Sequence, residues 1–295
     1  MPPNTIDSVA LTDGRSIEYA EYGDPKGKNI IFFHGLIGSY HQASPAHEAA
    51  KNHGFRLIAP NRAGVGHSSP NETKTIVERM DDIRELLEKL NVEDFGVVGL
   101  SGGSPYALAA AHVFETRVKT VAAISGMGTI ADLNLLQRME PSRRRTLQLA
   151  KFPFLANLYL SWRMRGYAKN PEVFLDSLIQ RWPKADQELF KNPALRSMFL
   201  GDLDHTLHLG SGTKGLSQEL RRYFHWGFDP QTIEQQVHLW HGTDDHIVPP
   251  VMSEYMAERL PNSEVSLHPG GHSMIVNIIG DVMRKAGENF KDTNS

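Results

Sequence analysis

The sequence of 295 residues predicts an α/β fold, with a mostly parallel central sheet flanked by helices and an inserted helical cap. Three observations support this prediction. Strand-like and helix-like segments alternate through the first 126 residues, as they do in α/β proteins. The strand-like segments are continuously apolar, as expected where helices cover both faces of a parallel sheet. The alternation stops near residue 127 and returns near residue 230.

The elements of the first part follow each other at short intervals. Strands are expected at 17–23 and 29–35, on either side of the turn signal Asp24-Pro25-Lys26-Gly27. The further elements expected there are a strand at 55–61, a helix at 73–90, a strand at 95–101, a helix at 102–114 and a strand at 118–126. After the insertion, strands are expected at 237–245 and 263–271, with a helix at about 250–260 between them and a last helix from near His272.

The interruption of the strand-helix alternation divides the chain into two predicted domains. Residues 1–126 and 230–295 form the core domain, and residues 127–229 form a helical cap (lid) inserted into it. Aromatic and basic residues stand at helical spacings in the insertion. Its stretch 138–165 holds seven Lys or Arg residues against the single acidic residue Glu140. Either its apolar side packs down over the site and its charges face water, or it lies on an anionic interface; we favour the first interpretation.

Composition narrows the functional class. A net charge of -3 argues against a dedicated nucleic-acid binder, which is usually strongly basic. The chain has no cysteine, which excludes disulfides, a thiolate nucleophile and a cysteine-ligated metal. The first residues show no signal-peptide pattern, and the longest apolar-rich stretch, 149–162, is too short to span a membrane. We therefore expect a cytoplasmic protein without stable membrane insertion.

The stretch DFGVVGLSGGSPYALAAA (94–111) places a serine between glycines where a strand turns into a helix. The stretch does not match a phosphate-binding loop, because no lysine follows the glycines and their spacing does not fit a dinucleotide fingerprint. Gly99-x-Ser101-x-Gly103 fits a nucleophile elbow, in which the serine hydroxyl is exposed at the carboxyl end of the sheet. Larger residues at 99 and 103 would clash with the neighbouring strand or helix. We predict that Ser101 is a nucleophile.

A serine nucleophile needs a base, and the base needs a carboxylate that orients it. The elbow fold provides these groups in the chain order Ser, Asp, His. Asp244 and Asp245 follow the strand at 237, and His272 follows the next strand, so both loops lie at the same sheet edge as Ser101. By position alone either aspartate is a candidate acid.

Four motifs carry a family resemblance: His34-Gly35-Leu36-Ile37-Gly38, Gly64-x-Gly66-x-Ser68, HGTDDHIVP (241–249) and GGHSM (270–274). With the elbow, they resemble the α/β-hydrolase superfamily and its capped serine hydrolases. The resemblance implies that Asp245, not Asp244, is the acid, and that the backbone N–H groups of Leu36 and Gly102 form an oxyanion hole. It also implies that His34, Gly35, Gly99 and Gly103 support the site.

The predicted function is that of a serine hydrolase that cleaves a carboxylic ester of a small hydrophobic substrate through an acyl-enzyme intermediate. The catalytic residues are Ser101, Asp245 and His272, and neither a metal nor an organic cofactor is expected. The only partner expected is this substrate, with a hydrophobic acyl or alcohol part, and not a nucleic acid. The cap residues predicted to line its pocket are Phe152, Phe154, Leu158 and Trp162.

Two alternatives remain open. The same triad serves hydrolysis of lactones, thioesters, amides or carbon–carbon bonds, as well as perhydrolysis. The other alternative is a ligand receptor or signalling module that has this fold and turns over slowly.

The cluster Asp202-x-Asp204-His205-x-x-His208 is interpreted as a solvated cap loop, because it lacks a third well-spaced ligand set for a metal.

Overall fold

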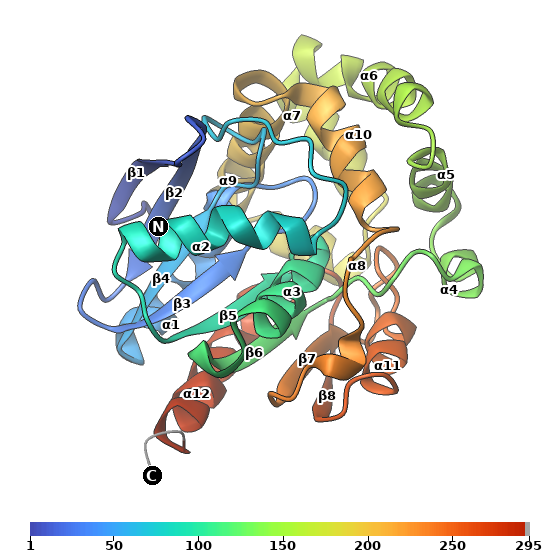
Figure 1. Ribbon diagram of the computed structural model, residues 1–295. Helices are drawn as coiled ribbons and strands as arrows, with labels where there is room; N and C mark the ends of the chain where they lie inside the picture. Colours follow the sequence, from blue (N-terminus) through green and yellow to red (C-terminus); the bar gives the residue numbers. More distant parts are fainter. Residues whose placement is uncertain (293–295) are drawn as a thin grey trace.

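A computed structural model describes residues 1–292 and contains an eight-stranded sheet in the order β1-β2-β4-β3-β5-β6-β7-β8 (Figure 1). Residues 293–295, which the predicted core domain includes, lie outside the described residues. The strands are β1 (Thr5–Ala10), β2 (Ser16–Gly23), β3 (Lys28–Phe33), β4 (Phe55–Pro60), β5 (Phe95–Leu100), β6 (Val118–Ile124), β7 (Val237–Gly242) and β8 (Ser263–His268).

The sheet is mostly parallel, as predicted. β1 pairs with β2, and β2 with β4, in the antiparallel sense, while all the other pairs are parallel. Strand β1 was missed in the sequence, because TIDSVA is short and polar and leaves most of its side chains exposed at the edge of the sheet.

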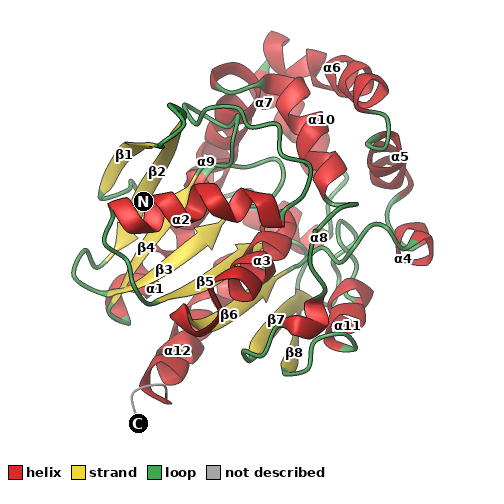
Figure 2. Cartoon of the chain, in the orientation of Figure 1, coloured by secondary structure: helices red, strands yellow, loops and turns green. Residues whose placement is uncertain are grey.

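Helices cover both faces of the sheet (Figure 2). Helices α2 (Met80–Lys89), α3 (Ser104–Phe114) and α11 (Val251–Ala257) share one apolar core with it, and α1 (His47–Asn52) and α12 (Ile275–Asp292) share the other. The helix predicted from residue 73 begins later, with a 3₁₀ turn at Val77–Arg79 and then α2. The reason is local: the backbone N–H groups of Lys74 and Thr75 donate to the Glu78 carboxylate instead of to helical carbonyls.

In the described chain, helices without strands connect β6 to β7. They are α4 (Leu133–Gln137), α5 (Pro141–Leu149), α6 (Pro153–Lys169), α7 (Pro171–Ile179), α8 (Lys184–Leu189), α9 (Pro193–Asp204) and α10 (Gly212–Arg222). Proline opens four of them, a position where its missing N–H costs no helical hydrogen bond. Asn170 and Asn192 also cap α7 and α9 by accepting from Val173 N–H and Ala194 N–H. Within residues 1–292 we find no helix that is both long and apolar enough to cross a membrane.

Buried charged residues join this helical segment to the sheet. Glu219 of α10 accepts a hydrogen bond from Tyr106 of α3 (2.6 Å) and pairs with Arg62, which follows β4 (3.4 Å), and with Arg222 (3.1 Å). Burial alone would raise the pKa of Glu219, but the charges of Arg62 and Arg222 hold it below its ordinary value. The carboxylate is therefore ionised and paired, and α10 is held against the core.

A second connection runs from α9 to the loop after β3. Asp202 accepts hydrogen bonds from the backbone N–H (2.9 Å) and the hydroxyl (2.6 Å) of Ser39. Its side chain is completely buried, and this burial raises the pKa of Asp202 to about 7 although the Ser39 bonds act in the opposite direction. The interpretation of 202–208 as a solvated loop is wrong, because Asp202 is buried in α9 and residues 205–209 form a π-helical turn.

Asp202 makes the stability of the fold depend on pH. The carboxyl has an ordinary pKa of about 3.9 when unfolded, so between about pH 4 and 7 only the folded chain keeps the proton. The free energy of unfolding should therefore fall as pH rises through this range, by up to about 1.4 kcal/mol per pH unit, and level off above it. Asp202→Asn should remove this dependence. Urea unfolding of both proteins at pH 5, 6, 7 and 8 measures it, and a constant difference between them would contradict the assignment.

Candidate active site

Ser101 stands at the turn between β5 and α3, and its backbone has a φ of 53°, in the left-handed region. Its glycine neighbours provide the space for this turn. A Cβ atom on Gly99 would lie 2.6 Å from the carbonyl oxygen of Gly103, and one on Gly103 would overlap the carbonyl oxygen of Phe33 in the adjacent strand. The glycines that flank the serine are therefore required by packing, as the sequence pattern predicted.

Ser101, His272 and Asp245 form a continuous chain of hydrogen bonds. His272 Nε2 is 2.9 Å from Ser101 Oγ, and His272 Nδ1 is 2.7 Å from Asp245 Oδ2. The three residues follow β5, β8 and β7, which run parallel, so their loops meet at one edge of the sheet. A carboxylate opposite Nδ1 selects the imidazole tautomer that carries its proton there, and this leaves Nε2 to accept the serine proton.

Asp245, and not Asp244, is the carboxylate on the histidine. Asp245 is 1% exposed, and its Oδ1 accepts the backbone N–H groups of Ile247 (2.8 Å) and Val248 (2.9 Å). Asp244 is exposed to solvent. Burial alone would raise the pKa of Asp245, but its interactions with His272 and His241 hold it well below the ordinary value. Asp245 is therefore charged at neutral pH and can stabilise a protonated His272.

Leu36 and Gly102 border the same cavity as Ser101. A Cβ atom added to Gly102 would lie 3.2 Å from Leu36 Cβ, so the two residues stand side by side. The peptide that carries the Leu36 N–H is held at its other end, because the Gly35 carbonyl accepts from Arg62 Nη2 (2.6 Å) and Gly35 N–H donates to Gln42 (2.7 Å). These contacts fix the direction of the Leu36 N–H.

His34 lies behind this loop and away from the serine. Its Nε2 accepts the Arg62 backbone N–H (3.2 Å), which places its proton on Nδ1, where it donates to the Gly35 carbonyl (2.9 Å). Burial, and then the charge of Arg62, lowers the pKa of His34 well below its ordinary value. His34 is therefore a neutral support of the loop.

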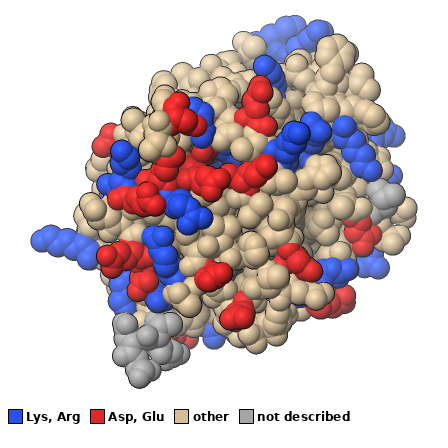
Figure 3. All heavy atoms as spheres, in the orientation of Figure 1, with Lys and Arg blue, Asp and Glu red and all other residues tan. Residues whose placement is uncertain are grey.

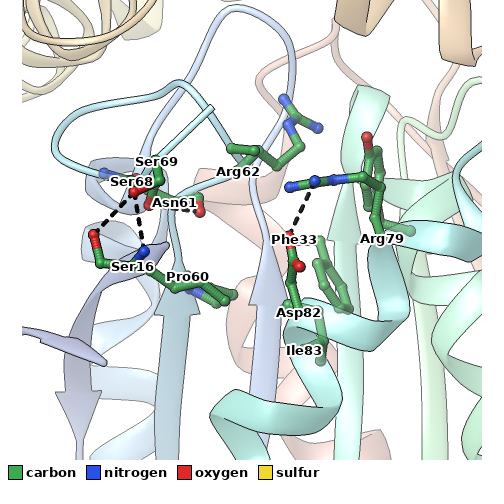
Figure 4. A pocket seen from close by; sticks show the side chains of 13 residues that line it. Ser16, Phe33, Pro60, Asn61, Arg62, Ser68, Ser69, Arg79, Asp82 and Ile83 are labelled. Atoms are coloured by element: carbon green, nitrogen blue, oxygen red, sulfur yellow. Dashed lines mark hydrogen bonds and ion pairs between the residues drawn. The ribbon is translucent and has the colours of Figure 1, made fainter. Parts of the chain in front are cut away.

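Arg62 was not recognised from the sequence as a site residue. Besides holding Gly35, its guanidinium donates to the Gly102 carbonyl (3.3 Å), which also accepts from the Tyr223 hydroxyl (2.9 Å). Arg62 also lines a cavity with a volume of about 20 Å³. Figure 4 shows the side chains around it, among them Asn61, Ser68 and the ion pair of Arg79 with Asp82. That cavity is large enough for little more than one water molecule and is too small for a substrate.

Asp186 of α8 was also missed. Its fully buried carboxylate accepts the backbone N–H groups of His272 (2.9 Å) and Ser273 (2.8 Å). A Cβ atom on Gly271 would overlap the same carboxylate, so glycine is needed there. The helical segment between β6 and β7 thus positions the backbone of the histidine. Nothing in the local pattern KADQEL distinguishes Asp186 from an exposed helical aspartate.

Two cavities meet at Ser101. One has a volume of about 310 Å³ and the other of about 90 Å³, and Leu36, Ile37, Ser101 and Phe199 line both of them. Only the smaller one includes His272. Apolar side chains from α5, α6 and α10 line the larger cavity, among them Leu147, Tyr159, Leu160, Met164, Leu216 and Leu220.

The pocket residues predicted from the sequence were wrong. The side chains of Phe152, Phe154, Leu158 and Trp162 line neither cavity at Ser101 and are 60%, 78%, 59% and 61% exposed. Helix α6 does contribute to the larger cavity, but through Tyr159, Leu160, Arg163 and Met164 on its opposite side. Because both sides of α6 carry large apolar residues, the sequence does not show which side faces the core.

The cluster at 202–208 does not come together as a ligand set. Asp202 binds Ser39, His205 Nε2 lies 3.1 Å from the Tyr40 hydroxyl, and Asp204 pairs with His208 at 2.9 Å. Across residues 1–292 the structure contains no group of three or more His, Asp or Glu side chains that could hold a metal ion.

A family model described as the alpha/beta hydrolase fold matches residues 28–277, which is most of the chain. The chain belongs to this family. The match takes in Ser101, Asp245 and His272 together with the helices between β6 and β7.

Individual relatives are distant. An uncharacterized hydrolase, YcgS of Bacillus subtilis, is 28% identical over 109 residues, which is 37% of each chain, so this match spans little more than a third of that relative. The non-heme chloroperoxidase CPO-A1 of Kitasatospora aureofaciens is 23% identical over 91% of this chain and 92% of its own. The enol-lactonase of Burkholderia xenovorans LB400 superposes with a TM-score of 0.71 at 17% identity, covering 97% of this chain and 100% of its own. These similarities establish the fold but not a particular substrate.

The steric requirement at the elbow can be tested with two glycines. Gly103→Ala should lower the free energy of unfolding by about 1–3 kcal/mol, because its methyl group has no room beside Phe33. Gly280→Ala, in helix α12 with nothing within 4 Å of the added methyl group, should instead raise it by about 0.5–1 kcal/mol. Urea unfolding measures both variants. Equal effects of the two substitutions would show that the elbow has room for a side chain.

Proposed function

We propose that the protein is a serine hydrolase that cleaves a carboxylic ester of a small hydrophobic substrate through an acyl-enzyme intermediate. The observation that carries this proposal is the hydrogen-bonded chain from Ser101 through His272 to Asp245, which ends at a largely apolar cavity. A nucleophile, a base and a buried carboxylate in this order are the groups that acyl transfer to serine requires.

Each group has a defined task in the proposed reaction. Ser101 Oγ attacks the ester carbonyl while His272 Nε2 accepts its proton, and Asp245 stabilises the imidazolium that forms. The N–H groups of Leu36 and Gly102 donate to the oxyanion. One such donor contributes about 3 kcal/mol to transition-state stabilisation in related sites. His272 then protonates the leaving alcohol, and a water molecule activated by the same histidine releases the acid.

The two cavities suggest how the substrate is oriented. The leaving alcohol must receive its proton from His272, which lines only the smaller cavity of about 90 Å³. The acyl part then occupies the larger cavity of about 310 Å³, which has an apolar lining. We therefore propose an ester with a larger apolar acyl group and a smaller alcohol.

The presence of two cavities at Ser101 also distinguishes ester hydrolysis from lactone hydrolysis and from a receptor function. A lactone keeps its acyl and alcohol parts in one ring and does not need two separate cavities beside the serine. A receptor needs no proton-transfer chain between a serine and a buried carboxylate. Ester hydrolysis is the reaction that uses both features.

The nucleophile can be tested with p-nitrophenyl esters from acetate to decanoate. Wild type should turn over repeatedly, and Ser101→Ala should lose activity by a factor on the order of 10⁶, down to the background hydrolysis. The adjacent aspartates are a matched pair: Asp245→Asn should lower kcat by about 10⁴, whereas Asp244→Asn should change it little. Undiminished turnover by Ser101→Ala would exclude the proposed mechanism.

The assignment of the two cavities can be tested by filling each in turn. Leu147 lines only the larger cavity and Met198 only the smaller one. Leu147→Trp should lower kcat/KM at least tenfold for ethyl decanoate and leave ethyl acetate nearly unchanged, because the added ring occupies the space of a long acyl chain. Met198→Trp should instead lower kcat/KM for butyl acetate more than for ethyl acetate, because the added ring occupies the space of the alcohol. These rates can be measured by pH-stat titration. If each variant showed the effect expected of the other, the acyl and alcohol cavities would have to be exchanged.

A further inference from the structure

The outer side of helix α6 is an apolar surface that the rest of the described chain leaves uncovered. We call it the α6 outer face. It consists of Phe152, Phe154, Leu155, Leu158 and Trp162, whose side chains are 60%, 78%, 47%, 59% and 61% exposed. Large exposed apolar side chains gathered on one element mark a surface that binds something. Figure 1 shows α6 at the outer edge of the molecule, beyond α10.

Helical spacing explains why these residues share one side. Leu155, Leu158 and Trp162 are separated by three and four residues and therefore line up along the helix. Ala156, Leu160 and Tyr167 lie on the opposite side and are buried. Since α6 already buries one apolar side, the exposed side is not needed to hold the helix in place.

The charges around this face are all of one sign. Arg165 and Lys169 are exposed on the same side of the helix as Trp162, and α6 contains no acidic residue. Lys151 precedes the helix, and its ammonium group lies over the Phe224 ring. Residues 138–169 contain eight Lys or Arg against one Glu, in a chain whose net charge is -3. Figure 3 shows Lys and Arg side chains at the edge where Figure 1 places α6, while Asp and Glu gather over α2.

We propose that the α6 outer face binds the surface of an anionic lipid bilayer. Apolar residues that include Phe, Leu and Trp, flanked by Lys and Arg on an exposed helix, match a helix that lies in the plane of the headgroups. The basic residues have no acidic partner on the helix itself, and lipid phosphates would supply the negative charge. A symmetric pair of these chains would place the same basic residues against each other and is disfavoured by that repulsion.

This orientation would bring the bilayer close to the larger cavity. The inner side of α6 provides Tyr159, Leu160, Arg163 and Met164 to the cavity beside Ser101. Substrates with an apolar acyl group concentrate in membranes, so a bound enzyme would meet them there. This consequence rests on the proposed function, whereas the binding itself does not.

Vesicle co-sedimentation of the full chain tests the proposal without any activity assay. The protein should bind vesicles of phosphatidylcholine with one-quarter phosphatidylglycerol, bind phosphatidylcholine alone at least tenfold more weakly, and be released by 0.5 M salt. Leu158→Ser with Trp162→Ser, and separately Arg165→Glu with Lys169→Glu, should each weaken binding at least tenfold. The matched controls carry the same kinds of substitution at exposed positions outside α6 and should bind like wild type. They are Ile6→Ser with Leu267→Ser, and Lys51→Glu with Lys89→Glu.

Trp162 provides a second readout at the face itself. Its emission should shift to the blue on adding anionic vesicles, and Trp162→Phe should abolish that shift, because the other tryptophans lie elsewhere in the fold. The proposal is overturned if wild type does not prefer anionic vesicles or if the α6 variants bind as well as the controls. It is also overturned if wild type is a dimer that Leu158→Ser with Trp162→Ser converts to a monomer without affecting any vesicle binding.

Discussion

The left-handed backbone of Ser101 is the constraint on which the rest of the site depends. A non-glycine residue with φ of 53° stores strain of about 1–3 kcal/mol, which the surrounding structure must hold in place. Here a side chain on Gly99 would meet the backbone of Gly103 and Ser104, and one on Gly103 would meet the backbone of Phe33 in β3. The hydroxyl is thereby presented at the edge of the sheet where β7 and β8 deliver Asp245 and His272.

The helical segment between β6 and β7 contributes to the site as much as the sheet does. Asp186 holds the backbone of His272, Asp202 holds the loop after β3, and Glu219 pairs with the Arg62 that supports Gly35. These carboxylates are all buried, and breaking a buried polar contact leaves an unpaired group at a high cost. Helices α8, α9 and α10 are therefore structural parts of the site, whereas α6 turns an apolar side outward.

The sequence was informative where the chemistry is local. Ser101, Asp245 and His272 each stand directly after a strand, within short motifs whose glycines are required by close backbone approach, and the structure brings them together in the expected order. The sequence was uninformative where residues that are distant along the chain come into contact. Asp186 lies 86 positions from the histidine whose N–H it accepts, and no periodicity in α8 marks it. The polar edge strand β1 likewise had no apolar pattern from which to predict it.

The sequence by itself determined the α/β class, the elbow serine and its two partners, because apolar runs, glycine spacing and chain order are properties of short segments. The tertiary structure alone decided which side of α6 faces the cavity, since both of its sides are apolar and only packing against α7 and α10 distinguishes them. It also decided that Arg62, Asp186 and Asp202 support the site. A charged residue at such a position looks like any surface residue until the fold buries it against the group that it holds.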